Sequence, residues 1–257
     1  MQTHITAHAR SHANACTPIS PQNVGLVYHN TTAWRKANIY LPETCAILEH
    51  HSESLHSLFK IYAGDVVQSA KAGSSKLLGA DEWISLLRDV GLIKEIGFRR
   101  SYLIFVHSRM AVIDESTRKG QDTNTQLPFE GFAEAIVRVA EIKALPSDRE
   151  MRSTGYQVPG EFLGALLGQA GAVFNEWLRK AQLMRQQNRV DPIWRRVDML
   201  ILLLVSIVQF GVEKLPGGAS LLLRGSPDER LSYEEVKRFF KHPTPNVFET
   251  STSTGGA

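Results

Sequence analysis

The feature that most constrains the fold of this chain is an apolar spacing typical of amphipathic helices, which occurs four times between residues 55 and 140. In each stretch, large apolar residues recur every three or four positions, so that they fall on one face of a helix. The four sets are Leu55, Leu58, Phe59 and Tyr62; Trp83, Leu86, Leu87 and Val90; Phe98, Tyr102 and Phe105; and Phe132, Ile136, Val139 and Ala140. The spacing predicts four helices, each with one buried face.

Polar segments separate the first of these helices from the second and the third from the fourth. Residues 64–75 and 114–126 are rich in Gly, Ser, Thr and Asp, a composition typical of loops. Gly91 follows the second helix, at a position where glycine commonly ends a helix. The order of these segments predicts two helix–loop–helix units. Residues 23–41, which precede them, contain Val, Tyr and Ile without regular alternation, and we expect an extended segment there.

The composition is that of a soluble globular protein, with 257 residues of which 43% are hydrophobic and 21% are charged. A net charge of +3 supplies no strong field toward nucleic acid or membrane, and we expect neither as a partner. Cys16 and Cys45 form no disulfide framework, which indicates a reducing, cytoplasmic compartment. No G-x-S-x-G, H-E-x-x-H or Walker motif occurs, so the sequence indicates no enzyme class.

We expect an all-α protein with two helical domains. Pro, Ser, Thr and Gly are frequent around residue 150, which is typical of a linker. The predicted division is a disordered tail over 1–22, a helix–loop–helix domain with an N-terminal extension over 23–148, a linker over 149–159, a second helical domain over 160–243 and a disordered tail over 244–257.

The most apolar segment is 199–212, which reads MLILLLVSIVQFGV. As a helix, this segment would span about 21 Å, which is short of the roughly 30 Å of hydrocarbon in a bilayer. We therefore expect a buried core helix, with a membrane-associated helix as the alternative. Gly160, Gly164 and Gly168 stand four residues apart and predict a helix face that a neighbouring helix approaches closely.

Residues 120–131 have part of the pattern of an EF-hand calcium loop. Such a loop has oxygen ligands at positions 1, 3 and 5, an aliphatic residue at position 8 and a bidentate glutamate at position 12. With Leu127 at position 8, Asp122 and Asn124 take positions 3 and 5, whereas position 12 is Gly131. The carboxylate that holds calcium most firmly is therefore missing.

Two further segments repeat this spacing and depart from it in other ways. Leu78 takes position 8 and Glu82 position 12 of residues 71–82, but Lys71 at position 1 would repel a cation. Leu231 and Glu235 take the same two positions in a third segment. Neither of the first two loops offers the six to eight oxygen ligands that calcium requires, so we expect no metal there.

The order of short phrases over about 52–144 resembles the EF-hand-like domain of the tubulin polymerization-promoting protein family and related calmodulin-like flagellar proteins. The matching phrases are Asp89–Ile93, Ile104–Phe105, Leu127–Phe132 and Ala140–Lys143. The resemblance implies paired EF-hand-like units in which Leu78 and Leu127 face each other in a short backbone bridge. It also implies a non-catalytic cytoskeletal protein of the cilium or flagellum that binds microtubules or an axonemal partner. The long insert over 111–126 and the second half of the chain depart from the family.

The most basic stretch of the chain is 177–196, which contains a single acidic residue, Asp191. Opposite charges speed and orient docking, so an acidic protein surface such as that of tubulin is the predicted partner. A solvated helix face without a partner is the alternative. The candidate partner-binding residues are Arg179, Lys180, Arg185, Arg189, Arg195 and Arg196.

Four potential ligands near the start of the chain, His4, His8, His12 and Cys16, are also spaced by four residues. They would share one face of a helix and could hold zinc or copper, but Ser, Thr and Asn around them favour an irregular tail. We expect no cofactor. The function predicted from the sequence is a calcium-independent, non-catalytic interaction protein, with a calcium-sensing regulator or a membrane-associated protein as alternatives.

Overall fold

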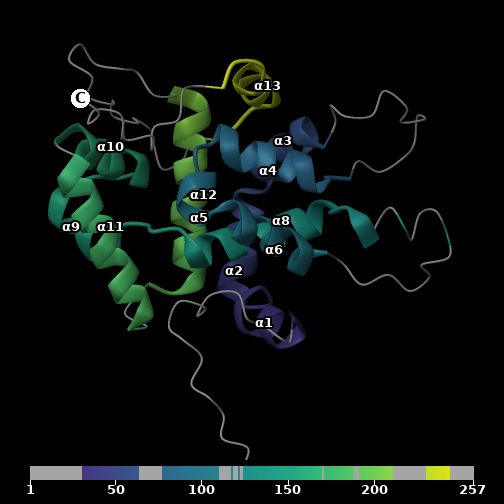
Figure 1. Ribbon diagram of the computed structural model, residues 1–257, viewed down its shortest axis with the longest axis horizontal. Coiled ribbons are helices and arrows are strands. Elements are labelled where there is room, and N and C mark those ends of the chain that lie inside the picture. Colours follow the sequence, from purple (N-terminus) through teal and green to yellow (C-terminus); the bar gives the residue numbers. More distant parts are fainter. Residues whose placement is uncertain are drawn as a thin grey trace, which may run out of the picture.

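The computed structural model describes residues 31–63, 77–109, 117, 121, 124–169, 171–187, 191–210 and 230–243. These residues have the predicted all-α fold (Figure 1). The predicted tails over 1–22 and 244–257 lie outside them. The helices in chain order are α1 (Thr31–Asn38), α2 (Pro42–His50), α3 (Ser52–Tyr62), α4 (Ala80–Asp89), α5 (Ile93–Ile96), α6 (Phe98–Ser108), α8 (Phe129–Ile142), α9 (Asp148–Thr154), α10 (Pro159–Gln169), α11 (Gly171–Gln186), α12 (Ile193–Phe210) and α13 (Tyr233–Lys241).

Two helix–loop–helix units are present, one made of α3 and α4 and the other of α6 and α8. Leu78 stands two residues before α4, and Leu127 stands two residues before α8. Each leucine donates its backbone N–H to the carbonyl oxygen of the other over 2.8 Å, in an antiparallel bridge. Both side chains are buried. The pairing expected of Leu78 and Leu127 is therefore present, and it joins the two units through their backbones.

The two units are connected by the one-turn helix α5, which lies between two glycines. Gly91 and Gly97 have φ angles of 75° and 83°. Residues with a Cβ rarely adopt this region, so glycine is favoured at both turns. Gly91 follows α4 closely, as predicted, and Gly97 is the N-cap of α6.

Helix α6 buries a different face from the one that its apolar spacing predicts. Its buried side chains are Ser101, Ile104, Phe105 and Ser108. Phe98 and Tyr102, which were predicted to face the core, are 63% and 47% exposed. The small Ser101 lies against α4, and its backbone carbonyl accepts a 2.9 Å hydrogen bond from the indole nitrogen of Trp83. Trp83 is fully buried, so this contact fixes which side of α6 faces the core.

Part of the segment predicted to be extended, 23–41, is helical. Helix α1 occupies 31–38 of this segment, and residues 23–30 lie outside the described part of the chain. An eight-residue helix has little stability by itself and depends on tertiary packing. Here Trp34 supplies that packing, because its side chain is buried in the core. The prediction was wrong because apolar spacing within so short a segment does not reveal a single anchoring residue.

Helix α12 occupies the centre of the molecule, between the helix–loop–helix units and α9–α11 (Figure 1). It packs against α8, α2, α10 and α13. Every residue from 199 to 208 is buried, which confirms the predicted core helix over that range. Among the described helices, none combines the length and the apolar character needed to cross a membrane.

Helix α9 begins at Asp148 and occupies the first six residues of the segment 149–159 that was predicted to be a linker. Ser147 and Glu150 form a capping box, in which each side chain bonds the backbone N–H of the other residue. Met151 and Val158 are buried. The missed signal is the Ser-x-x-Glu spacing before an apolar residue, which favours a helix start. Buried apolar side chains on both sides of this segment belong to one core cluster, which extends from Trp34 to Phe239.

The glycine face of α10 lies partly in this core. Gly160 and Gly164 are buried, whereas Gly168 is exposed. Helix α10 packs against both α11 and α12. The first two glycines of the predicted face are therefore buried, and the third is not.

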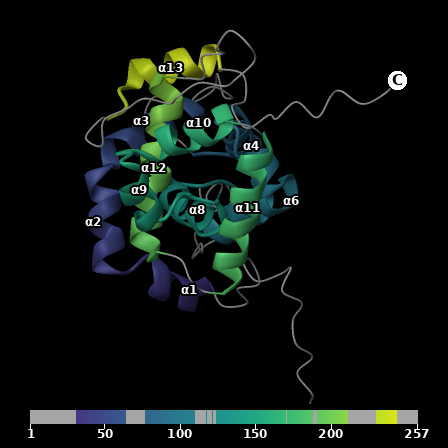
Figure 2. The same ribbon diagram turned by 90° about the vertical axis from the view of Figure 1, so that its left-hand side faces the viewer.

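Helix α13 covers α3 and one end of α12 (Figure 2). Leu231 stands two residues before α13, as Leu78 and Leu127 do before their helices. Its backbone N–H donates to the Ser54 hydroxyl over 2.9 Å, and its carbonyl accepts from the Ser57 hydroxyl over 3.1 Å. Two serines of α3 therefore bind the backbone groups that a second loop would bind in a paired unit.

Candidate functional site

The position at which an EF hand carries its bidentate glutamate is closely packed in the second unit. Gly131 is buried at the start of α8. A Cβ at this position would lie 2.9 Å from the carbonyl oxygen of Ser108 and 3.2 Å from a methyl carbon of Leu127. A longer side chain would require the end of α6 to move. The start of α8 therefore packs where a ligand side chain would need space.

The corresponding glutamate of the first unit, Glu82, turns toward the start of its own helix. Its carboxylate occupies the space that a Cβ on Gly79, the N-cap of α4, would need. A carboxylate near the free N–H groups at a helix N-terminus is stabilised by them. Among the described residues, no group of three or more His, Cys, Asp or Glu side chains is placed to hold a metal ion. Lys71 and Asp122 lie outside those residues, as do the tail ligands His4, His8, His12 and Cys16.

Two arginines of the basic stretch bind the C-terminal end of α8. Arg185 of α11 donates to the carbonyl oxygen of Ile142, and Arg196 of α12 donates to that of Glu141. The last carbonyls of a helix have no partner within it, and they form the negative end of its dipole. Burial lowers the pKa of Arg185. Both arginines therefore serve as a cap that holds three helices together.

Arg195 also points inward, into an ion-pair network between α9, α12 and the junction of α2 with α3. Its guanidinium contacts Asp148 over 2.7 Å and Asp198 over 2.5 Å. Asp198 in turn lies 2.8 Å from the Nε2 atom of the buried His51. Two surface hollows of about 410 and 460 Å³ open beside this network and share Arg195 and Gln157 in their linings. Arg195 lines both hollows, Asp148 lines the first and Asp198 lines the second. These three charges beside the hollows are therefore paired within the network.

The remaining described cations of the stretch, Arg179 and Lys180, point into solvent from α11. Their side chains are 61% and 67% exposed, and both lie near Glu176, at 2.9 and 3.5 Å. The hydrogen bond from Arg179 is the main reason that the pKa of Glu176 is lowered to about 2. The same helix leaves apolar side chains exposed to solvent, namely Val173, Leu183 and Met184.

The structure therefore separates the six candidate partner-binding residues. Arg179 and Lys180 are available to a partner, Arg185, Arg195 and Arg196 bind groups of this chain, and Arg189 lies outside the described residues. Helical spacing could have identified Arg185, because it continues the inward face of α11 made by Phe174, Trp177, Leu178 and Ala181.

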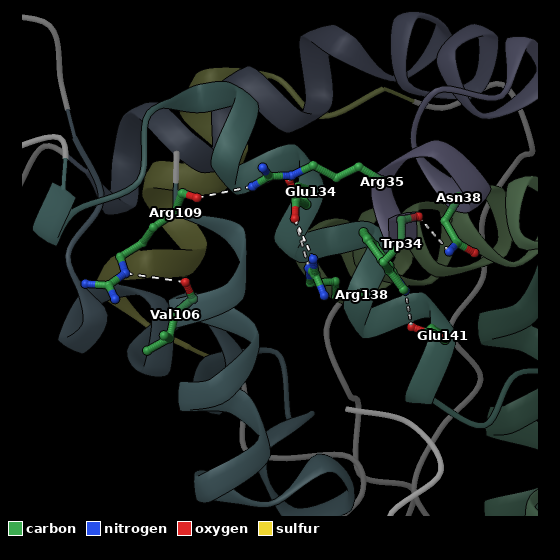
Figure 3. Close-up of polar contacts among 8 residues, drawn as sticks. All are labelled: Trp34, Arg35, Asn38, Val106, Arg109, Glu134, Arg138 and Glu141. Carbon is green, nitrogen blue, oxygen red and sulfur yellow. Dashed lines mark hydrogen bonds and ion pairs between the residues drawn. The ribbon is translucent and has the colours of Figure 1, made fainter. Parts of the chain in front are cut away.

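A cluster of buried polar side chains, which sequence reasoning missed, fastens α1 to α8 (Figure 3). Glu134 accepts hydrogen bonds from Arg35 over 2.7 Å and from Arg138 over 2.7 and 3.0 Å. The Arg138 guanidinium also lies 3.7 Å from the centre of a Trp34 ring, in a cation–π contact. The indole nitrogen of Trp34 donates to Glu141 over 3.1 Å. In the sequence, the four-residue spacing of Glu134 and Arg138 on α8 could have indicated their ion pair. The sequence of α1 contains no sign that Arg35 and Trp34 would join them.

Burial affects the basic groups in and beside this cluster. It lowers the pKa of Arg138, while the hydrogen bond to Glu134 acts in the opposite direction. Burial, followed by the nearby positive charge of Arg138, also lowers the pKa of His107 on α6. A neutral His107 is therefore favoured near the buried Arg138.

We compared the chain with models of known protein families, with curated proteins and with solved structures, and none of them matches.

Proposed function

We propose that this chain is a non-catalytic interaction protein of the cytoskeleton, and that it docks on an acidic protein surface through the outward face of α11. The observation that carries the proposal is that this face presents Arg179 and Lys180 together with the exposed Leu183 and Met184. Apolar side chains gain free energy when a partner covers them, and the two cations would orient an acidic partner. Neither contribution requires a catalytic group.

Tubulin, or an axonemal protein with a similarly acidic surface, is the proposed partner. The support for this choice is the resemblance of residues 52–144 to the tubulin polymerization-promoting protein family and related flagellar proteins. A cytoplasmic location in the cilium or flagellum belongs to the same proposal. Three of the cations first assigned to this partner bind groups of this chain. The outward face of α11, which carries Arg179 and Lys180, therefore becomes the proposed contact.

The proposed binding is independent of calcium. The backbone bridge between Leu78 and Leu127 holds the two units together, and Gly131 packs against α6 where a ligand would stand. The groove in which a partner helix would bind an EF-hand pair is not the proposed site either. Helix α12 already packs on α8, and α13 already packs on α3.

Co-sedimentation with microtubules tests this proposal. We expect the wild-type chain to pellet at low salt with or without calcium, and Arg179→Gln/Lys180→Gln to bind about fivefold more weakly, because two rim cations are lost. The matched control is Arg238→Gln/Lys241→Gln, which removes two exposed cations from α13. Wild-type chain that stays in the supernatant would exclude tubulin. Equal binding by both variants would exclude α11 as the docking face.

A further inference from the structure

We propose that the outer face of α6 is a second docking site, which binds an acidic amphipathic helix of a partner protein. The site is separate from the outward face of α11, and its argument is independent of the docking proposed there. It begins with the two most prominent aromatic side chains of this helix. Phe98 is 63% exposed and Tyr102 is 47% exposed.

The distribution of side chains on α6 departs in part from that on an ordinary surface helix, although Ile104 and Phe105 are buried as expected. Ser101 and Ser108 are fully buried, while a phenylalanine and a tyrosine face solvent. Surface helices normally turn their large apolar residues toward the core and their polar residues outward. Exposed aromatic side chains are also the residue types that most often anchor protein interfaces. This arrangement therefore indicates that something else covers the outer face of α6.

The exposed residues form a continuous strip. Phe98, Tyr102 and the half-buried Val106 follow one another at intervals of four, so they lie along one side of the helix. The strip is about 12 Å long, since each residue of a helix rises by about 1.5 Å. A strip of this length fits two to three turns of a second helix, whose apolar residues would recur at positions i, i+3 or i+4, and i+7.

The charge around the strip selects the kind of helix. Helix α6 contains the exposed Arg99 and Arg100 and no acidic residue. Two carboxylates of neighbouring helices are already bound to cations, since Glu95 of α5 contacts Lys143 over 2.6 Å and Glu134 of α8 contacts Arg35 and Arg138. Arg99 and Arg100 therefore place positive charge at the Phe98 end of the strip. A partner helix with acidic residues flanking its apolar face would complement it.

A second copy of this chain is a poorer occupant than a different protein. In a symmetric dimer through this face, each α6 would meet the other. Each α6 carries Arg99 and Arg100 and no acidic residue, so the two basic helices would repel each other. An acidic helix of another protein avoids this repulsion.

The test uses the full chain and a labelled synthetic peptide of about fourteen residues, with Leu and Phe on one helical face and Glu on the flanks. We expect the peptide to bind the wild-type chain in fluorescence polarisation. Phe98→Ser/Tyr102→Ser should weaken binding by at least about tenfold, because interface aromatics act as anchors. The matched control is Tyr40→Ser/Tyr233→Ser, which removes two exposed aromatics elsewhere and should bind like wild type. Circular dichroism should show the same helix content in all three chains.

Several results would overturn the proposal. They are absence of peptide binding up to millimolar concentration, equal binding by the α6 variant, and equal binding of a peptide with Lys in place of Glu. Sedimentation equilibrium tests whether a second copy of this chain occupies the site instead. If the wild-type chain dimerises and the α6 variant does not, the occupant is a second copy and the acidic partner helix is wrong.

Discussion

Basic side chains serve different purposes in two regions of this molecule, around α8 and on the outward face of α11. Around α8, Arg35 and Arg138 share Glu134, and Arg185 and Arg196 bind the last carbonyls of the helix. On α11, the cations lie in solvent beside one exposed carboxylate. Three inward arginines, Arg185, Arg195 and Arg196, come from the same basic stretch as the two outward cations. A basic sequence therefore does not by itself indicate a binding surface.

Burial accounts for the difference. A cation taken out of water needs a counter-charge or several hydrogen bonds, so the inward arginines are fixed by specific acceptors. A cation left in water is solvated and gains little from its neighbour. The inward arginines contribute to holding helices together, and the outward cations of α11 remain available to a partner.

The largest effect is expected when the shared carboxylate around α8 is removed. Glu134→Ala removes the carboxylate that Arg35 and Arg138 share, and we expect a loss of about 3–5 kcal/mol in unfolding free energy. Chemical denaturation followed by circular dichroism measures it. The matched control is Glu176→Ala, which removes the carboxylate shared by the two outward cations and should leave the unfolding midpoint unchanged. Equal losses in the two variants would break the comparison.

A smaller effect is expected at the end of α8. Arg185→Met keeps most of the apolar side chain but removes the donor to the carbonyl of Ile142, so we expect a loss of about 1–2 kcal/mol. Arg179→Met makes the same replacement on the outward face of α11 and should not change stability. If Arg185→Met were as stable as wild type, the inward arginine would not act as a cap, and its role as a partner contact would have to be reconsidered.

The sequence predicts part of this arrangement. The resemblance to an EF-hand pair implied the pairing of Leu78 and Leu127, which stand at the same position of their two loops, and the backbone bridge between them is present. The same spacing before α13 did not reveal what Leu231 contacts. Its backbone is bound by the hydroxyls of Ser54 and Ser57, and helical periodicity does not report such side-chain substitutes.

The faces that helices bury were harder to predict than the helices themselves. For α6, two sets of residues with helical spacing share Phe105, and the prediction chose the set with the large aromatic residues Phe98 and Tyr102. The core instead accommodates Ser101, because the fully buried Trp83 lies against its carbonyl. That constraint comes from Trp83 on α4, so the sequence of α6 and its neighbours alone does not reveal it. The cluster around Glu134 was missed for a similar reason, since Arg35 lies 99 residues away from it in the chain.

The smallest effect concerns His107, which lies close enough to the inward cations to respond to them. Burial and the positive charges of Arg138 and Arg109 lower its pKa, and the negative charge of Glu134 opposes this shift only in part. Because the folded state favours the neutral imidazole, the unfolded chain binds more protons once the pH falls below the ordinary value of 6.5. The contribution of His107 to stability is therefore fully present at pH 7.5 and decreases as the pH falls through 6.5.

His107→Gln removes this dependence. Unfolding free energies of the wild-type and variant chains, measured at several values between about pH 7.5 and 5.5, should differ by an amount that shifts in favour of the variant as the pH falls. Other titrating groups contribute equally to both chains, so the difference isolates His107. A difference that stays constant with pH would mean that the folded chain binds a proton on His107 as readily as the unfolded chain does. Burial and the positive charges of Arg138 and Arg109 would then leave the proton affinity of His107 unchanged, and the influence of Arg138 would end at the carboxylate of Glu134.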